Sequence, residues 1–149
     1  MTDEAMVHGG HHDLGRFLNA QEGVYPQALR ELRNGSKESH WMWYIFPQLR
    51  GLGTSGKAVR FGIASLDEAR AYLGHPVLGP RLLECCAALL EVDGLSALEI
   101  LGPPDDMKLR SSATLFSLVS PAGSRFHALL DKFFGGCPDP ATLELVGQV

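Results

Sequence analysis

Apolar positions recur along the chain with the spacing of amphipathic helices. Tyr25, Ala28, Leu29 and Leu32 follow the i, i+3, i+4, i+7 pattern, with a proline in the first turn. The clearest pattern of this kind is made by Phe126, Leu129, Leu130, Phe133 and Phe134. In both segments the apolar side chains fall on one helical face, so each predicts a helix with one buried side.

Capping residues and breakers divide the rest of the chain into short helices. Ser65 and Ser96 each stand three residues before a glutamate, which predicts two capping boxes. Asp13 is the predicted N-cap of the first helix and Asp139 that of the last. Pro103-Pro104 followed by two aspartates predicts the start of a longer helix. We therefore predict an all-α fold, a compact single-domain bundle of about seven to nine short helices.

Signals for β-strands are few. No Asn-Gly or Asp-Gly turn is flanked by alternating apolar residues, and no glycine-rich phosphate loop follows an apolar run. Residues 40–46 are ambiguous, because a short aromatic run is compatible with either a buried strand or a buried helix.

Length and hydropathy favour one domain that is not embedded in a membrane. The chain has 149 residues, which suits a single domain, and we expect a flexible N-terminal tail over 1–12 and one helical domain over 13–149. Its apolar runs are far shorter than the roughly 20 residues that cross a bilayer, and its start lacks the features of a secretion signal. We therefore expect a cytoplasmic protein without a membrane partner.

Cysteine and histidine usage predicts neither a disulfide nor a metal site. Cys85 and Cys86 fall on the apolar face of a predicted helix, so we expect them to be small buried hydrophobes. The histidines His8, His11 and His12 lie in the predicted tail without a ligand at fixed spacing. We expect no metal and no cofactor.

The charge distribution is uneven. The net charge is −4, but the segment 25–60 holds six basic residues and two acidic ones. Such a local positive stretch suits a small anion or an acidic partner better than duplex DNA, whose binders are usually basic throughout. The alternative is a basic surface that is merely solvated.

The first candidate for chemistry is the segment 37–50, which holds both tryptophans of the chain. We expect an aromatic ring there to stack on a ligand, the bases to neutralise phosphate and the polar groups to contact its edges. The candidate ligand-binding residues are Lys37, Trp43, Tyr44, Gln48 and Arg50, and His40 is a candidate catalytic residue. The alternative is a core segment, because adjacent large aromatics usually fill space.

The second candidate is the segment 105–112, which places acids, bases and hydroxyls on one stretch of helix. We expect Asp106 to act with His40 as an acid/base pair, and Lys108, Arg110 and Ser111 to bind an anion. The alternative is an Asp106–Arg110 pair on the helix surface, which stabilises by about 0.2–0.5 kcal/mol.

Four segments of the chain together carry a resemblance to a known family. They are Asp13–Phe17 with Ala20–Gln21, Ser39–Gly53, Tyr72–Leu82 and Asp106–Phe116. On these segments the chain resembles the bacterial domain-of-unknown-function family 1810. The resemblance implies a compact, mainly α-helical single domain and no particular reaction. Some relatives carry a calpastatin label, which we do not adopt because such inhibition is expected of disordered repeats, whereas this chain is globular in composition.

Two functional hypotheses follow. In the first, the two candidate segments meet and bind or hydrolyse a phosphorylated small molecule, such as a nucleotide or an ADP-ribose-like compound; the latter is named by analogy with other small helical domains. In the second, the protein is a non-enzymatic interaction module whose exposed tryptophan and arginine anchor a protein partner. Burial of the tryptophans, and the presence or absence of a cavity beside the candidate residues, distinguish the two.

Overall fold

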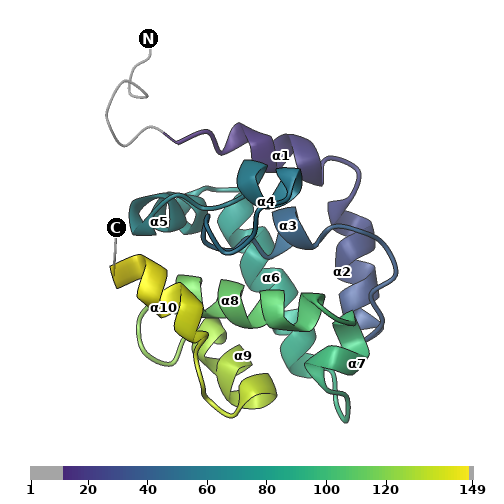
Figure 1. Ribbon diagram of the computed structural model, residues 1–149. Coiled ribbons are helices and arrows are strands. Elements are labelled where there is room, and N and C mark those ends of the chain that lie inside the picture. Colours follow the sequence, from purple (N-terminus) through teal and green to yellow (C-terminus); the bar gives the residue numbers. More distant parts are fainter. Residues whose placement is uncertain (1–11, 148–149) are drawn as a thin grey trace.

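The computed structural model describes residues 12–147, and in that range it contains ten helices and no strand (Figure 1). The helices are α1 (Gly15–Gln21), α2 (Tyr25–Arg33), α3 (Met42–Ile45), α4 (Gly56–Arg60), α5 (Leu66–Gly74), α6 (Leu78–Glu91), α7 (Ala97–Leu101), α8 (Asp105–Ser117), α9 (Arg125–Phe134) and α10 (Pro140–Gly147). The predicted all-α class is confirmed, and seven of these helices have seven residues or more, in line with the predicted number. Most of the predicted tail, with His8 and His11, lies outside the described residues.

Serine hydroxyls cap several of the helices. The serines at positions 55, 65, 96 and 124 each accept a hydrogen bond from a backbone N–H in the first turn of the helix that follows. Ser96 forms the complete capping box, because the side chain of Glu99 also accepts from the N–H of Ser96. This confirms the prediction at the start of α7.

Two predicted caps differ in the structure. At Ser65 only half of the box forms, because the Glu68 carboxylate accepts from the N–H of Ala64 and from Arg16 instead of the N-cap N–H. The cap predicted at Asp13 is wrong: α1 begins at Gly15, and no side chain caps it. At Ser65, the contacts of Glu68 with Arg16 and Ala64 thus occupy the carboxylate that a complete capping box would need.

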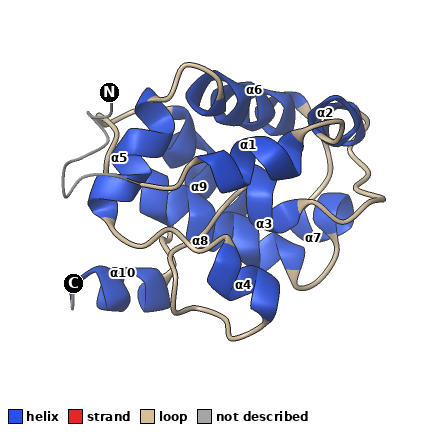
Figure 2. Cartoon of the chain, turned by 90° about the horizontal axis from the view of Figure 1, so that it is seen from above, coloured by secondary structure: helices blue, strands red, loops and turns tan. Residues whose placement is uncertain are grey.

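Helix α8 runs through the middle of the molecule. Leu109 and every residue from 111 to 116 are buried, so α8 has no broad polar face along this stretch. Helices α5, α7, α9 and α10 pack against it, and α6 packs against α2, α5 and α9 behind. Figure 2 shows α4 and α10 toward one edge of this arrangement and α6 and α2 at the other. Polar residues of α8 therefore reach solvent mainly near its N-terminal end.

A chain of aromatic rings crosses the core. The ring centroids of Phe17 and Tyr72 are 5.1 Å apart, those of Tyr72 and Phe116 5.5 Å, and those of Phe116 and Phe126 5.4 Å. These separations are typical of favourable aromatic pairs. The rings connect α1 and α5 with the consecutive helices α8 and α9.

The amphipathic face predicted near the C-terminal end belongs to α9. Phe126, Leu129 and Leu130 are buried, whereas Phe133 and Phe134 are half-buried. The last turn of α9 therefore lies at the margin of the core.

Cys85 and Cys86 are buried on α6, as predicted. Burial raises the pKa of the Cys85 thiol to about 12 and that of the Cys86 thiol well above its ordinary value. Both thiols stay protonated near neutral pH, which fits a packing role.

The ambiguous aromatic segment forms one helical turn, α3, followed by extended chain. Ile63 donates to the carbonyl of Gln48 over 2.9 Å, and Arg50 donates to the carbonyl of Ile63 over 2.8 Å. Between these strand-like contacts the chain makes α4, which the hydrophobic pattern did not predict. A Cβ on Gly62 would lie 2.7 Å from the Cβ of Arg50, so only glycine permits this close approach.

Candidate functional site

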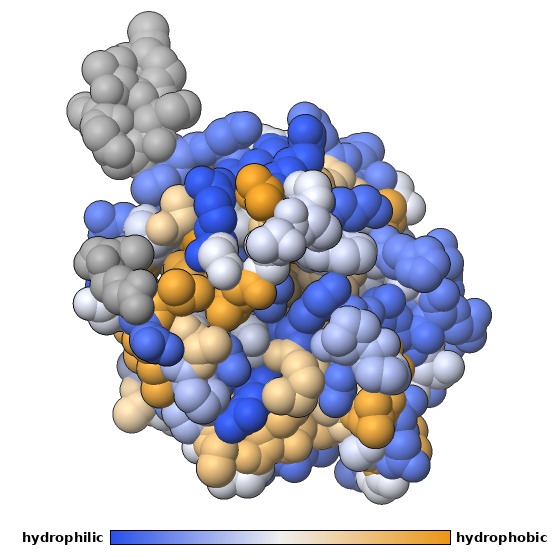
Figure 3. Space-filling view, viewed as in Figure 1, coloured by the Kyte–Doolittle hydropathy of each residue, from blue (hydrophilic) through white to orange (hydrophobic). Residues whose placement is uncertain are grey.

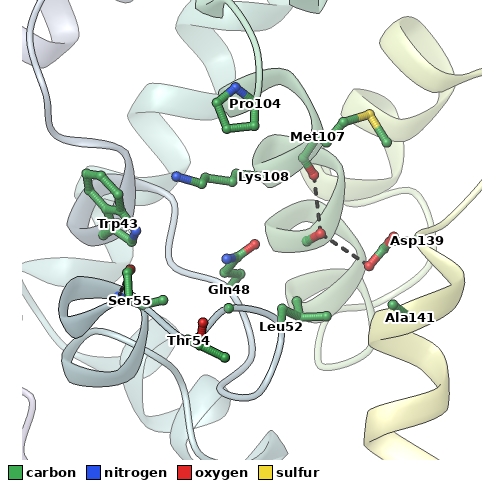
Figure 4. Close-up of a pocket in the computed structure, with 13 residues that line it drawn as sticks. Trp43, Gln48, Leu52, Thr54, Ser55, Pro104, Met107, Lys108, Asp139 and Ala141 are labelled. Atoms are coloured by element: carbon green, nitrogen blue, oxygen red, sulfur yellow. Dashed lines mark hydrogen bonds between the residues drawn. The ribbon is translucent and has the colours of Figure 1, made fainter.

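A cavity of about 470 Å³ opens between the segment 43–58, helix α8 and the start of α10 (Figure 4). It is lined by Trp43, Gln48, Leu52, Gly53, Thr54, Ser55, Ala58, Pro104, Met107, Lys108, Ser111, Asp139 and Ala141. Both candidate segments contribute to this wall, the first through Trp43 and Gln48 and the second through Lys108 and Ser111. The structure therefore brings the two segments together.

Glu31 of α2 holds the chain that leads into α3. Its buried carboxylate accepts from the backbone N–H groups of Glu38 and Ser39, over 2.9 and 3.1 Å, and from Trp41 Nε1 over 2.9 Å. The Ser39 hydroxyl and the Gln27 amide donate to its other oxygen. Burial raises the pKa of Glu31, but the hydrogen bonds outweigh that effect and lower the pKa to about 2. Trp41 is thereby fixed in the core with no exposed surface.

Trp43, two residues further on, lies half-buried at the wall of the cavity. The ammonium nitrogen of Lys108 is 4.1 Å from the centre of its ring, and that of Lys57 is 5.1 Å away. In Figure 4 the Lys108 side chain extends across the cavity toward the indole. The negative face of an aromatic ring attracts such cations. Two lysine ammonium groups therefore lie next to the Trp43 ring.

Ion pairs behind the wall join the two segments. Lys37 Nζ lies 2.9 Å from one carboxylate oxygen of Asp105, and Lys108 Nζ lies 3.5 Å from the other. The Lys37 side chain is only 8% exposed. This predicted ligand-binding residue therefore pairs with Asp105 of α8 and does not line the cavity. Lys108 keeps donors for another partner, because an ammonium group has three hydrogens.

Asp139 forms the opposite wall and caps α10. Its Oδ2 atom accepts from the backbone N–H of Thr142 over 3.0 Å and from the Thr142 hydroxyl over 2.6 Å, which confirms the predicted cap. The hydroxyl of Ser111 lies 3.2 Å from this same oxygen and 3.2 Å from the carbonyl of Met107 (Figure 4). The Oδ2 atom of Asp139 is therefore occupied by contacts with α8 and α10.

The extended segment 48–55 supplies the neutral polar groups of the cavity. Gln48 lies between Lys108 and Thr54 in Figure 4. Within residues 12–147 the side chains of Gln48 and Thr54 make no hydrogen bond, whereas the Ser55 hydroxyl accepts from the N–H of Ala58. An amide and a hydroxyl are thus available to contact a ligand.

Three other predicted ligand-binding residues lie outside this cavity. The Tyr44 hydroxyl donates to the carbonyl of His40 over 2.8 Å, so it closes a local turn. Arg110 donates to the carbonyls of residues 137 and 138, each over 3.0 Å, and so ties α8 to the connection between α9 and α10. Arg50 lines a different cavity.

The candidate catalytic residues are not joined to each other. Within the described range no hydrogen bond or ion pair links His40 to Asp106, and neither residue lines the cavity. His40 is exposed, whereas one buried oxygen of Asp106 has no hydrogen-bond partner among residues 12–147. The geometry supplies ligand-binding groups without an assembled acid/base pair.

Sequence reasoning missed Thr54, which lines the cavity, and Lys57, whose ammonium nitrogen lies 5.1 Å from the centre of the Trp43 ring. Both belong to a stretch rich in glycine, where neither helical nor strand periodicity is visible. The one signal available was Ser55, a serine before a short run containing Lys57, which is the local pattern of an N-cap.

Two further observations concern metal ligands and membrane-spanning helices. Among residues 12–147 no three His, Cys, Asp or Glu side chains are grouped as metal ligands would be. None of the helices in this range has the length and apolar character needed to cross a membrane.

The fold and the site define an all-helical protein with an open cavity flanked by tryptophan and lysine. Residues 11–146 match the family model described as "Protein of unknown function (DUF1810)", and the chain belongs to this family. It is similar to a solved structure, the "conserved hypothetical protein Rv1873 from Mycobacterium tuberculosis", with 55% sequence identity and a TM-score of 0.89. That match covers 91% of this chain and 96% of the other. No curated protein matches. The family resemblance is confirmed.

Proposed function

We propose that this protein binds a small phosphorylated molecule in the cavity beside Trp43, of the class of nucleotides and ADP-ribose-like compounds. The observation that carries the proposal is the position of the Lys108 ammonium, 4.1 Å from the Trp43 ring at the wall of an open cavity. An aromatic face next to a cation suits a ligand that has both a flat ring and a phosphate group.

The size and lining of the cavity support this ligand class. Its volume of about 470 Å³ lies within the range usual for small-molecule sites. Apolar side chains such as Leu52 and Met107 form part of the wall, and Gln48 and Thr54 add a few polar groups. A mainly apolar pocket with a small number of placed polar groups is the usual form of such a site.

The contacts around Trp43 also allow a ligand to enter. A cation–π contact at a partly exposed ring contributes about 0.5–1 kcal/mol. A hydrogen bond to a charged group contributes roughly 1.5–3 kcal/mol. Phosphate can therefore draw Lys108 or Lys57 off the ring, and the face thus vacated can stack on a base.

The proposal is binding and not hydrolysis. General acid/base catalysis needs both groups within hydrogen-bond reach of the reacting atoms. His40 and Asp106 lie outside the lining of the cavity, and no hydrogen bond joins them in the described part of the chain.

Replacing Lys108 with alanine is expected to weaken the binding of AMP and ADP-ribose about tenfold, because one charged hydrogen bond to phosphate is lost. Tryptophan fluorescence measures this directly, since Trp43 lies at the cavity and Trp41 is buried. Wild-type fluorescence should change saturably with ligand, and Trp43→Phe should abolish that change.

The matched control is Arg70→Ala, which removes an exposed cation that pairs only with Asp67 in the described structure. It should bind as the wild type does. If neither ligand changes the fluorescence or the melting temperature of the wild type, the proposal fails and a protein-interaction role becomes the better hypothesis.

A further inference from the structure

A second cavity, of about 410 Å³, is walled by α4 and the start of α1 and is lined by Asp13, Arg16, Arg50, Val59 and Arg60. Neighbouring residues of α4 line the two cavities, with Ala58 at the first and Val59 at the second. The side chain of Arg16 in α1 donates to the carbonyl of Arg60 at the end of α4, and the surface at the top of Figure 3, over these helices, is mostly hydrophilic. Three of the five lining residues are arginines, which makes this the cavity with the most basic lining among those described.

Arg16 forms a fixed part of the cavity wall. Its guanidinium donates to both oxygens of Glu68, over 3.0 and 3.3 Å, so its charge is neutralised. It also donates to the carbonyls of Asp13, Arg60 and Gly62. These contacts use all five N–H donors of the group. Arg16 is thereby unable to bind a ligand, but it fixes the backbone that carries Arg60.

Arg50 and Arg60, by contrast, present charge that no ion pair within residues 12–147 neutralises. Arg50 donates to the carbonyl of Gly62 over 3.2 Å, the same oxygen that Arg16 binds, and this uses one of its five donors. The Arg60 guanidinium lies 5.5 Å from the centre of the Phe61 ring. Within residues 12–147 neither side chain forms an ion pair, although the carboxylate of Asp13 belongs to the same cavity.

We propose that this second cavity binds the phosphoryl groups of a small molecule, with Arg50 and Arg60 as a clamp. Guanidinium groups suit phosphate because their planar fork donates two parallel hydrogen bonds to its oxygens. Arg16 and Gly62 hold the two backbones in place, so little conformational freedom is lost on binding. Val59, 50% exposed at the same wall, offers an apolar contact to the remainder of the ligand. The site is separate from the cavity at Trp43 and does not depend on it.

The test is calorimetric titration of pyrophosphate into the Lys108→Ala variant, in which the first cavity lacks its lysine. We expect this variant to bind one pyrophosphate as tightly as the wild type does. Adding Arg60→Ala or Arg50→Ala should raise the dissociation constant about tenfold or more, because charged hydrogen bonds to the phosphate are removed. Adding Arg70→Ala, an exposed arginine on α5, should leave it unchanged.

Circular dichroism of each variant shows whether a loss of binding is due to unfolding. Arg50 and Arg60 are both exposed, so their replacement should not unfold the chain. Malonate, a dicarboxylate of similar size, should bind more weakly than pyrophosphate. The proposal is overturned if wild type shows no binding, if Lys108→Ala alone abolishes it, if Arg60→Ala behaves like Arg70→Ala, or if malonate binds more tightly.

Discussion

Replacing Glu31 with alanine is expected to lower the free energy of unfolding by about 3–5 kcal/mol. The carboxylate is 6% exposed and accepts hydrogen bonds from two backbone N–H groups, from the Trp41 indole and from the Ser39 hydroxyl. Without it these donors lose their acceptor, and the indole of Trp41 is fully buried. Each buried donor left without a partner costs about 1–3 kcal/mol.

Urea denaturation measures this loss as a lower midpoint with an unchanged slope. Glu38→Ala is the matched control, because it removes an exposed glutamate from the same connection and should change stability by no more than about 0.5 kcal/mol. Equal destabilisation by the two replacements would contradict the role assigned to Glu31.

The same residue predicts a pH dependence. Its pKa falls from an ordinary value of 4.5 to about 2 in the folded protein, where hydrogen bonds favour the charged form. A folded-state pKa below the unfolded value means that Glu31 stabilises fully above pH 4.5 and that this stabilisation is lost as pH falls toward 2. The loss amounts to about 3 kcal/mol. The free energy of unfolding should be measured near pH 7 and at about pH 3. It should fall less between these two pH values in Glu31→Gln than in the wild type.

Replacing Glu68 with alanine is expected to cost about 3–5 kcal/mol as well, because it leaves a buried guanidinium without its counter-ion. Glu68 is 3% exposed and Arg16 9%, and their closest contact is 3.0 Å. The variant also removes the acceptor for the N–H of Ala64. Thermal or urea unfolding followed by circular dichroism gives the magnitude.

The neighbouring residue provides a sharp comparison. Asp67 pairs with Arg70 at 2.8 Å, but both side chains are more than half exposed, so Asp67→Ala should cost less than about 1 kcal/mol. In addition, Arg16→Met combined with Glu68→Met should cost less than the sum of the two single replacements, since the pair is removed together. Additive costs would show that the two charges do not depend on each other.

Local sequence patterns predicted much of the fold. The capping box at Ser96, the cap at Asp139 and the apolar face of α9 depend on residues within one or two helical turns, and the structure contains them. The start of α1 and the half-formed box at Ser65 were predicted less well. There the outcome depends on Arg16 and Glu68, which are 52 residues apart and pair in the core.

In the candidate site, too, the sequence predicted local features better than contacts between distant segments. Trp43 and Lys108 were both candidates from the sequence, and they line the same cavity. The Lys37–Asp105 contact that joins their segments is not revealed by any local pattern. Arg50 was grouped with Trp43 because the two are close in sequence, but the two residues line different cavities. Leu49 and Ile63 form a parallel β-bridge after α3, and Arg50, next to Leu49, lines the second cavity together with Arg60.

The most direct test of the ligand site is a nuclear magnetic resonance titration of the ¹⁵N-labelled protein with AMP. The indole N–H of Trp43 and the side-chain amide of Gln48 give separate signals, and both groups line the cavity. We predict that these signals, with the backbone signals of Thr54 and Ser111, shift saturably and together, while the indole of buried Trp41 stays unchanged. Saturable shifts confined to the opposite face around α2 and α6, or no saturable shift at all, would contradict the account.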